Sequence, residues 1–245
     1  MAKASGGKAV SGAALGILML EARFPRIPGD MGNALTWPFP VLYKVVREAS
    51  PERVVRRRAE GLLEAFIAAG RELVAAGADG VTTNCGFLSI YQAELAAALG
   101  VPVASSTLMQ VPLIARTLPP GRRVGVLTIS AETLTEEHLA MAGADPETPI
   151  MGTDQLPDGG REFTRVILGN EAEMDVAAAR LDNLDAARSL TSRHPDLGAI
   201  VLECTNMVPY AADIRAATGL PVYSVYNFIT WFQGALSPRR FPSSA

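Results

Sequence analysis

The chain has 245 residues, 22 basic and 25 acidic side chains, a formal net charge of −3 and 49% hydrophobic residues. This composition supplies a sizeable core and excludes disordered and fibrous classes, while the balanced charge gives no basic footprint for nucleic acid or an anionic membrane. Two cysteines, Cys85 and Cys204, are too few for a disulfide scaffold and are typical of a reducing compartment. We therefore expect a cytoplasmic protein whose partner is a small molecule.

The apolar stretch at residues 9–20 is interrupted by serine and glycine and is shorter than the roughly 20 residues of a membrane span. It also lacks a convincing signal-peptide cleavage site, so neither membrane insertion nor secretion is expected. Beyond it, short apolar runs alternate with longer helical patterns, which is typical of a mainly parallel sheet covered by helices. The expected strands are residues 15–20, 80–83, 101–104, 124–128, 149–152, 199–203 and 221–224.

Residues 51–76 are predicted to form one long helix, with Ser50 as its N-cap, Pro51 in the first position and Gly77 past its end. Its arginine-rich first turns are interpreted as a solvated face on which Arg56 pairs with Glu60. The other expected helices are residues 88–99, 131–142, 173–193, 210–217 and 227–236, and the two histidines, His138 and His194, are expected at the surface.

The chain contains an internal repeat at an offset of 119 residues, which aligns residues 79–105 with residues 198–224 without a gap. A second similarity, between residues 15–18 and 124–127, has an offset of 109. Each half therefore contains a glycine-bearing first strand followed later by a strand, a cysteine, a helix and a Gly-x-Pro-Val strand, which predicts two similar lobes. The identical pairs in the longer alignment are Cys85/Cys204, Tyr91/Tyr210, Ala93/Ala212, Ala97/Ala216, Ala98/Ala217, Gly100/Gly219, Pro102/Pro221, Val103/Val222 and Ser105/Ser224.

Each cysteine follows a predicted strand and precedes a predicted helix, which places it at the carboxyl end of its sheet, where open α/β folds bind ligands. The free N–H groups at the start of the following helix favour a thiolate. Pseudo-symmetry would set Cys85 and Cys204 across one cleft, where one thiol removes a proton from a carbon and the other delivers a proton to the opposite face. A free cysteine is more often a small buried hydrophobe, but equivalent positions in a duplicated turn favour the functional interpretation.

The two cysteine motifs are TTNCGF at residues 82–87 and VLECTNM at residues 201–207. In these motifs and in the opening strand that ends at Leu20, the chain resembles the aspartate/glutamate/hydantoin racemase superfamily. The resemblance implies an α/β fold of two Rossmann-like, mainly parallel lobes with an interlobe active-site cleft. Its lobes would be residues 1–104 with 227–245, which hold Cys85, and residues 105–226, which hold Cys204, with the final helix returning to the first lobe. Dimers are common in such families, so a homodimer is a further expectation.

By the same resemblance, Cys85 and Cys204 correspond to the acid/base thiols of a racemase or epimerase of amino acid metabolism that acts on a small carboxylic acid, with no metal or pyridoxal cofactor. The motifs depart from those of glutamate and aspartate racemases: Gly86 and Phe87 follow the first cysteine, Glu203 replaces the glycine common before the second, and Asn206 replaces a frequent histidine. These departures argue against ordinary glutamate or aspartate, and Phe87 predicts a more apolar wall. The alternatives are an enzyme similar to maleate isomerase or arylmalonate decarboxylase, and a non-catalytic small-molecule sensor.

Residues 21–40 form a long Pro/Gly-rich segment of the kind that often serves as a lid, and Arg23 or Arg26 within it is suited to binding a substrate carboxylate. Small hydroxyl residues and backbone N–H groups at the strand ends are suited to cradling a carboxylate or an enolate-like oxyanion. Glu203 is interpreted either as a tuner of the second thiol or as a strand residue that points away from it. The candidate substrate-binding residues are Arg23, Arg26, Asn84, Gly86, Phe87, Ser105, Thr128, Thr205 and Asn206.

Overall fold

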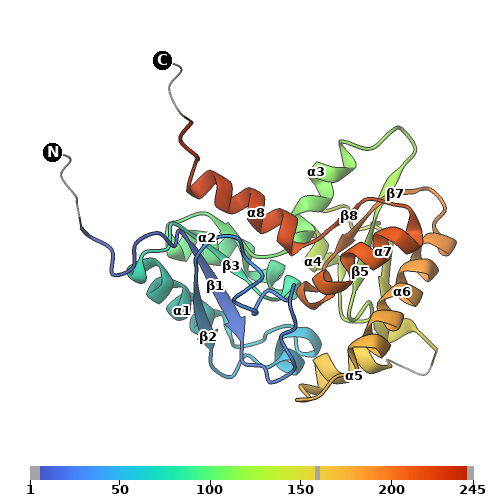
Figure 1. The fold of residues 1–245 in the computed structure, drawn as a ribbon, viewed down its shortest axis with the longest axis horizontal. Helices are drawn as coiled ribbons and strands as arrows, with labels where there is room; N and C mark the ends of the chain where they lie inside the picture. The colour runs from blue at the N-terminus through green and yellow to red at the C-terminus, as the bar shows by residue number, and fades with distance from the viewer. Residues whose placement is uncertain (1–5, 158–160, 242–245) are drawn as a thin grey trace.

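The computed structural model describes residues 6–157 and 161–241, which form two four-stranded sheets in which every paired strand is parallel. Figure 1 shows the sheets side by side, each with its own helices. The strand order of the first sheet is β2-β1-β3-β4 and that of the second is β6-β5-β7-β8, so the two sheets have the same topology. The strands are β1 (Leu15–Leu20), β2 (Val41–Val46), β3 (Gly80–Thr83), β4 (Val103–Ala104), β5 (Arg123–Thr128), β6 (Ile150–Gly152), β7 (Leu197–Leu202) and β8 (Val222–Tyr223).

Helices cover both sheets, and the predicted α/β fold with two similar lobes is confirmed. The α-helices are α1 (Leu63–Ala76), α2 (Gln92–Leu99), α3 (Val111–Ala115), α4 (Glu136–Met141), α5 (Glu162–Gly169), α6 (Val176–Arg193), α7 (Ala211–Thr218) and α8 (Val225–Leu236). Shorter helical segments are η1 (Glu52–Arg56), η2 (Gly86–Tyr91), η3 (Thr107–Gln110), η4 (Thr153–Gln155) and η5 (Thr205–Tyr210). In the part of the chain described, no helix combines the length and the apolar character needed to cross a membrane.

The sequence repeat corresponds to a structural repeat. After each cysteine comes a six-residue 3-10 helix, then an eight-residue α-helix, and then a two-residue strand, each displaced by 119 residues from its counterpart. Gly100 and Gly219 end the two α-helices in the left-handed conformation that glycine adopts most easily. The identities in the repeat therefore mark one strand-to-helix unit that is used twice.

Helix α8 runs from the second lobe back over the first sheet (Figure 1). Its buried face, with Phe228 and Ile229, packs into one cluster with Leu15 and Ile17 of β1. Close packing is also seen at Gly80, where a Cβ would lie 2.6 Å from a terminal carbon of Leu236. Helix α8 is thus fixed to the lobe that contains β1 and β3.

Several local predictions were wrong. The expected single helix over residues 51–76 is interrupted between η1 and α1, because Arg58 and Ala59 have φ values of 53° and the chain turns there. Strand β2 and helix α5 were not anticipated from the sequence pattern. His138 is buried rather than at the surface, since its Nδ1 accepts the backbone N–H of Thr135 and completes the cap of α4.

Candidate active site

Each cysteine occupies the turn between a strand and a 3-10 helix at the carboxyl edge of its sheet. Cys85 is the N-cap of η2 and Cys204 is the N-cap of η5, and both have extended backbones. Both are free thiols with 9% and 7% of their surface exposed, respectively. Because β-strands end here in both lobes, the two turns bring residues that are distant in sequence to one place.

Both thiols line the same cavity, which is about 20 Å3 and is therefore large enough for roughly one water molecule. A substrate requires the cleft to widen. The apolar part of the wall comes from the first lobe, from η1 and from α5, and the polar part comes from the two cysteine turns. The lining residues are Leu20, Phe24, Pro51, Val55, Asn84, Cys85, Gly86, Phe87, Ile129, Ile167, Leu168, Glu203, Cys204, Thr205 and Asn206.

Asn84 joins the two lobes beside the first thiol. Its side-chain Oδ1 accepts the backbone N–H of Leu20 at 2.7 Å, which fixes it to the end of β1. Its backbone carbonyl accepts the hydroxyl of Thr205 at 2.6 Å from the other lobe. All three residues line the cavity, so these bonds hold its polar edge in place.

Glu203 is the residue of the repeat that corresponds to Asn84, and its carboxylate is fully buried. Its Oε2 accepts the Thr128 hydroxyl at 2.6 Å, whereas its Oε1 has no hydrogen-bond partner in the described residues. Gly86 faces this side chain so closely that a Cβ there would lie 2.3 Å from Oε1 and 2.7 Å from the Glu203 carbonyl oxygen. The absence of a side chain at Gly86 is thus what makes room for the acid.

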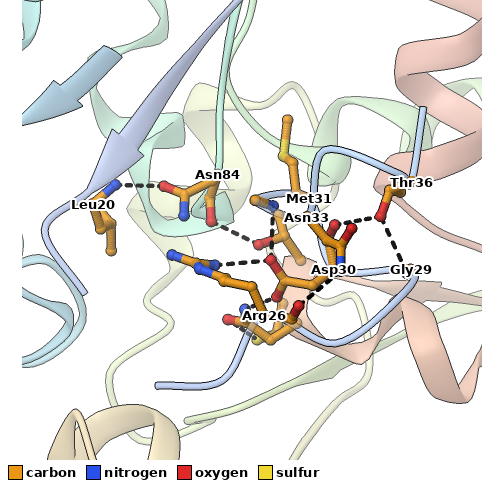
Figure 2. A network of polar contacts seen from close by, with 12 residues as sticks. Leu20, Arg26, Gly29, Asp30, Met31, Asn33, Thr36 and Asn84 are labelled. Carbon is orange, nitrogen blue, oxygen red and sulfur yellow. Dashed lines mark hydrogen bonds and ion pairs between the residues drawn. The ribbon is translucent and has the colours of Figure 1, made fainter. Parts of the chain in front are cut away.

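The segment that follows β1 reaches the second thiol through Asp30. Figure 2 shows the buried Asp30 carboxylate beside Arg26, with which it forms an ion pair at 3.0 Å. The other carboxylate oxygen of Asp30 accepts the side-chain amide N–H of Asn206. Since that bond orients the amide, Asn206 Oδ1 is left to accept the Cys204 S–H at 3.7 Å.

The electrostatics of the cavity disfavour thiolates. Burial raises the pKa of both Cys85 and Cys204, and the Glu203 carboxylate raises both further. The backbone N–H of Phe87 lowers the pKa of Cys85 and that of Asn206 lowers the pKa of Cys204, so corresponding N–H groups face the two sulfurs. Burial also raises the pKa of Glu203 itself to about 7, against the smaller opposing effect of the Thr128 hydrogen bond.

The structure brings most of the predicted site residues to this cavity and places others elsewhere. Arg26 lies over the ring of Phe24, a cavity residue, at 4.3 Å, and its charge lowers the pKa of Cys85. Arg23 is exposed, and its backbone N–H donates to Asn170. Ser105 binds Gln92 through its hydroxyl and backbone N–H and does not line the cavity. Thr128 does not line the cavity either, but its hydroxyl donates a hydrogen bond to Glu203, which does.

Apart from Phe87, the apolar part of the wall was not predicted from the sequence. Phe24 and Val55 come from an irregular segment and from the interrupted helix, and Ile167 and Leu168 come from the unanticipated α5. Nothing in their local pattern distinguishes them from core residues. Phe87, which was expected to be an apolar wall, lines the cavity and is supported from behind by His138, whose ring meets it edge-on at 5.3 Å.

Solved structures with the same arrangement of elements are a mutant of arylmalonate decarboxylase, with a TM-score of 0.62, and an aspartate racemase of Picrophilus torridus, with a TM-score of 0.56. They are 20% and 12% identical to this chain, and each comparison covers 94% of this chain and 96% of the other. The chain has the fold of the aspartate/glutamate racemase superfamily. A glutamate racemase of Bacillus anthracis is likewise similar, with a TM-score of 0.57 at 17% identity over 93% of this chain and 85% of the other. The fold expected from the resemblance to this superfamily is therefore confirmed.

The sequence is also similar to curated proteins with another activity in their names, although no protein-family model matches it. A dimethylsulfoniopropionate lyase of Durusdinium sp. clade D is 26% identical over 94% of this chain and 77% of its own length. Dimethylsulfoniopropionate lyase 7 of Emiliania huxleyi is 27% identical over 91% of this chain and 67% of its own length, and lyase 5 is 30% identical over 91% and 45%. The chain spans only about half of several of these relatives. The proteins that it resembles are named as enzymes, and the curated relatives found by sequence are named as lyases rather than isomerases.

Proposed function

We propose that the chain is a cofactor-independent enzyme that moves a proton at the carbon α to the carboxylate of a small acid, with Cys85 and Cys204 as its acid/base groups. The observation that carries this proposal is the convergence of two free thiols, one from each lobe, on a single cavity. A thiolate beside a substrate is able to act as a general base, and a thiol is able to return the proton. Backbone N–H groups at the two turns would stabilise the charge that develops on the carboxylate.

The first substrate to test is dimethylsulfoniopropionate, because the similar curated sequences are named for its lyase. In this reaction the thiolate of one cysteine takes the α-proton, and the electrons of the C–H bond form the Cα=Cβ double bond. The Cβ–S bond breaks, and its electron pair leaves with neutral dimethyl sulfide. The products are acrylate and dimethyl sulfide, and the thiol then releases its proton to water.

The surroundings of the thiols support different roles for them. Cys204 donates its S–H to Asn206, so it is held as a proton donor. No such acceptor for Cys85 Sγ is present within residues 6–157 and 161–241. Burial and the Glu203 carboxylate raise the Cys85 pKa, and the positive charge of Arg26 partly opposes that rise. We assign Cys85 as the base, and Cys204 as the acid where the reaction returns a proton to the carbon.

Racemisation or epimerisation is the second candidate, and the placement of thiols on walls from both lobes favours it. In that reaction Cys85 and Cys204 would exchange roles with the direction of turnover, so both would be indispensable. Elimination needs only the base for its first step. The two candidates therefore differ in what they require of Cys204.

The test is to incubate the purified chain with dimethylsulfoniopropionate and follow dimethyl sulfide by gas chromatography and acrylate by NMR. In parallel, small D- and L-acids in deuterated water report exchange of the α-hydrogen. We expect one of these two reactions, and we expect its loss in the Cys85→Ser variant. Ligand binding without turnover or exchange across the panel, or turnover unchanged in both cysteine variants, would refute the proposal and favour a sensor.

A further inference from the structure

We propose that Glu203 determines the specificity of this site by binding the positively charged onium group of a zwitterionic substrate, a small carboxylic acid that carries a methylated sulfonium or ammonium. The inference rests on the proposed function and names its substrate class. It assigns a role to the one carboxylate that lines the cavity.

The first reason is an unsatisfied oxygen. Glu203 is fully buried, and of its two carboxylate oxygens only Oε2 has a partner, the hydroxyl of Thr128. A buried carboxylate oxygen without a donor is costly, and such exceptions in folded proteins call for an explanation. Glu203 and Gly86, against which this oxygen lies, both line the cavity, so a cation bound in the widened cleft would reach the free oxygen.

The second reason is the sign of the charge. Within residues 6–157 and 161–241, no lysine or arginine lines the cavity, and Glu203 is the only carboxylate that does. A dicarboxylate such as aspartate, glutamate or a malonate would bring a second negative charge next to it. A zwitterion places one cation at Glu203 and leaves its own carboxylate for the backbone N–H groups of the cysteine turns.

The third reason is the apolar wall. Phe24, Phe87, Ile167 and Leu168 surround the thiols and the acid. A methylated onium group is a weakly hydrated cation with an apolar surface, and aromatic rings next to a carboxylate are suited to bind it. A strongly hydrated cation would lose its water in such a cavity without replacement.

Binding of an onium group would also prepare the thiols for reaction. The Glu203 carboxylate raises the pKa of both cysteines, and it does so through its negative charge. A cation in contact with Glu203 offsets that charge, so the thiolate becomes easier to form when the correct substrate is present. Recognition and reactivity would then be linked through one side chain.

The equivalent position in the other lobe shows that the acid is not a requirement of the fold. Asn84 occupies it, and its side-chain oxygen is satisfied by the Leu20 N–H. The turn therefore accepts a neutral amide in one lobe, whereas in the other it holds an acid for which Gly86 makes room. The acid thus adds a charge that the backbone of the turn does not need.

The experiment measures binding of two pairs of ligands that differ in charge and match in shape. One pair is 3-(trimethylammonio)propionate and 4,4-dimethylpentanoate, and the other is dimethylsulfoniopropionate and 4-methylpentanoate. Calorimetry with the ammonium pair uses the full chain, and the sulfonium pair is measured in the Cys85→Ser variant to avoid turnover. We expect the zwitterion of each pair to bind about 10- to 100-fold more tightly than its isosteric carboxylate, which lacks the onium charge.

In the Glu203→Gln variant, the affinities within each pair should differ by no more than about threefold, because only the two zwitterions bind more weakly. Glu203→Asp, which keeps the charge, should retain a preference, and Glu64→Gln on the exposed face of α1 is the matched control that should leave the ratio unchanged. Circular dichroism checks that each variant is folded. A preference that survives in folded Glu203→Gln, or that is absent from the unmodified chain, would overturn the inference.

The outcomes separate this inference from the proposed function. Turnover or α-hydrogen exchange that depends on Cys85, together with an unchanged preference in Glu203→Gln, overturns the role of Glu203 and leaves the chemistry standing. Loss of the preference in Glu203→Gln without any turnover or exchange supports the cation site and overturns the enzymatic proposal.

Discussion

The turn at Cys85 and the turn at Cys204 are built on the same succession of elements but carry different chemistry. Both cysteines cap a 3-10 helix that continues into an α-helix, and the following strands pair in the same order. Before the cysteine, the first turn has the amide Asn84 and the second has the acid Glu203; after it, the first has Gly86 and the second has Thr205. The duplicated backbone supplies positions, and the side chains at those positions distinguish the two thiols.

The differences between the turns depend on each other across the interface. In each lobe, the residue that follows the cysteine contacts the residue that precedes the cysteine of the other lobe. Thr205 donates its hydroxyl to the Asn84 carbonyl. Gly86 lies against the carboxylate Oε1 and the backbone carbonyl oxygen of Glu203. A threonine at both places would collide with the acid. The residues of each contacting pair therefore depend on each other, and a substitution in one lobe changes the packing of the other.

The largest expected effect is on catalysis and tests whether the two thiols are equivalent. For elimination, Cys85→Ser should lower kcat/KM by about 1,000-fold or more, since it removes the general base, while Cys204→Ser should lower it by about 10- to 100-fold. A racemase would instead lose comparable activity in both variants. Steady-state rates of dimethyl sulfide release and of α-hydrogen exchange distinguish the two results, and a larger loss in Cys204→Ser would reverse our assignment of the base.

The next effect concerns stability and tests the difference between Glu203 and Asn84. The pKa of Glu203 is raised from its usual 4.5 to about 7, so the folded chain binds this proton more tightly than the unfolded chain. The resulting stability is present at low pH and is lost as the pH rises from about 4.5 to about 7. Full loss amounts to about 3 kcal/mol, and Asn84 has no such dependence.

Urea unfolding of the unmodified chain and of Glu203→Gln at several pH values measures this loss. As the pH rises from 4 to 8, the unfolding free energy of the variant should increase by about 3 kcal/mol relative to that of the unmodified chain. This expected change does not depend on which of the two is more stable at any one pH. Glu64→Gln, at an exposed acid of α1 outside the cavity, controls for a general effect of removing a carboxyl. Parallel stability curves for the unmodified chain and Glu203→Gln would contradict the raised pKa.

A smaller effect tests the close approach of Gly86 to Glu203. Gly86→Ala should destabilise the chain by about 1–3 kcal/mol, because its Cβ would lie 2.3 Å from Glu203 Oε1 and 2.7 Å from the Glu203 carbonyl oxygen. In the Glu203→Ala background the first of these contacts is gone, so the cost should fall although the second remains. Unfolding free energies of the two single variants and the double variant form a cycle, and strict additivity would show that the two side chains do not meet.

Much of the scaffold was predictable because its signals are local. The first strand and the strand before Cys85 were predicted with the observed bounds, and the repeat predicted two lobes with one cysteine at the same turn of each. Strand ends, helix starts and their order in a parallel sheet follow from short-range patterns and from chain order. The placement of Asn84, Gly86, Phe87, Thr205 and Asn206 at the cavity follows from the same turns.

The parts that could not be predicted depend on contacts between residues that are distant in sequence or on side-chain pairings that the local pattern does not reveal. The interruption between η1 and α1 leaves the apolar spacing unchanged, so periodicity alone did not reveal that Val55 reaches the cavity. The direction of Glu203 could not be settled from strand alternation, because the position that accepts it is created by Gly86 of the other lobe. Arg23 and Arg26 are close in sequence, and only the ion pair with Asp30 separates the buried network of Arg26 from the exposed Arg23.

The smallest expected effect tests the hydrogen bond that has no counterpart at Gly86. Thr205→Val keeps the shape of the side chain but removes the hydroxyl that donates to the buried Asn84 carbonyl, which should cost about 1–2 kcal/mol of unfolding free energy. Thr205→Ser retains the donor and should lose less, which separates the hydrogen bond from the packing of the methyl group. If Thr205→Val proved as stable as the unmodified chain while Thr205→Ser lost stability, the hydrogen bond between the lobes would contribute nothing measurable, and packing of the methyl group alone would explain the threonine at this position.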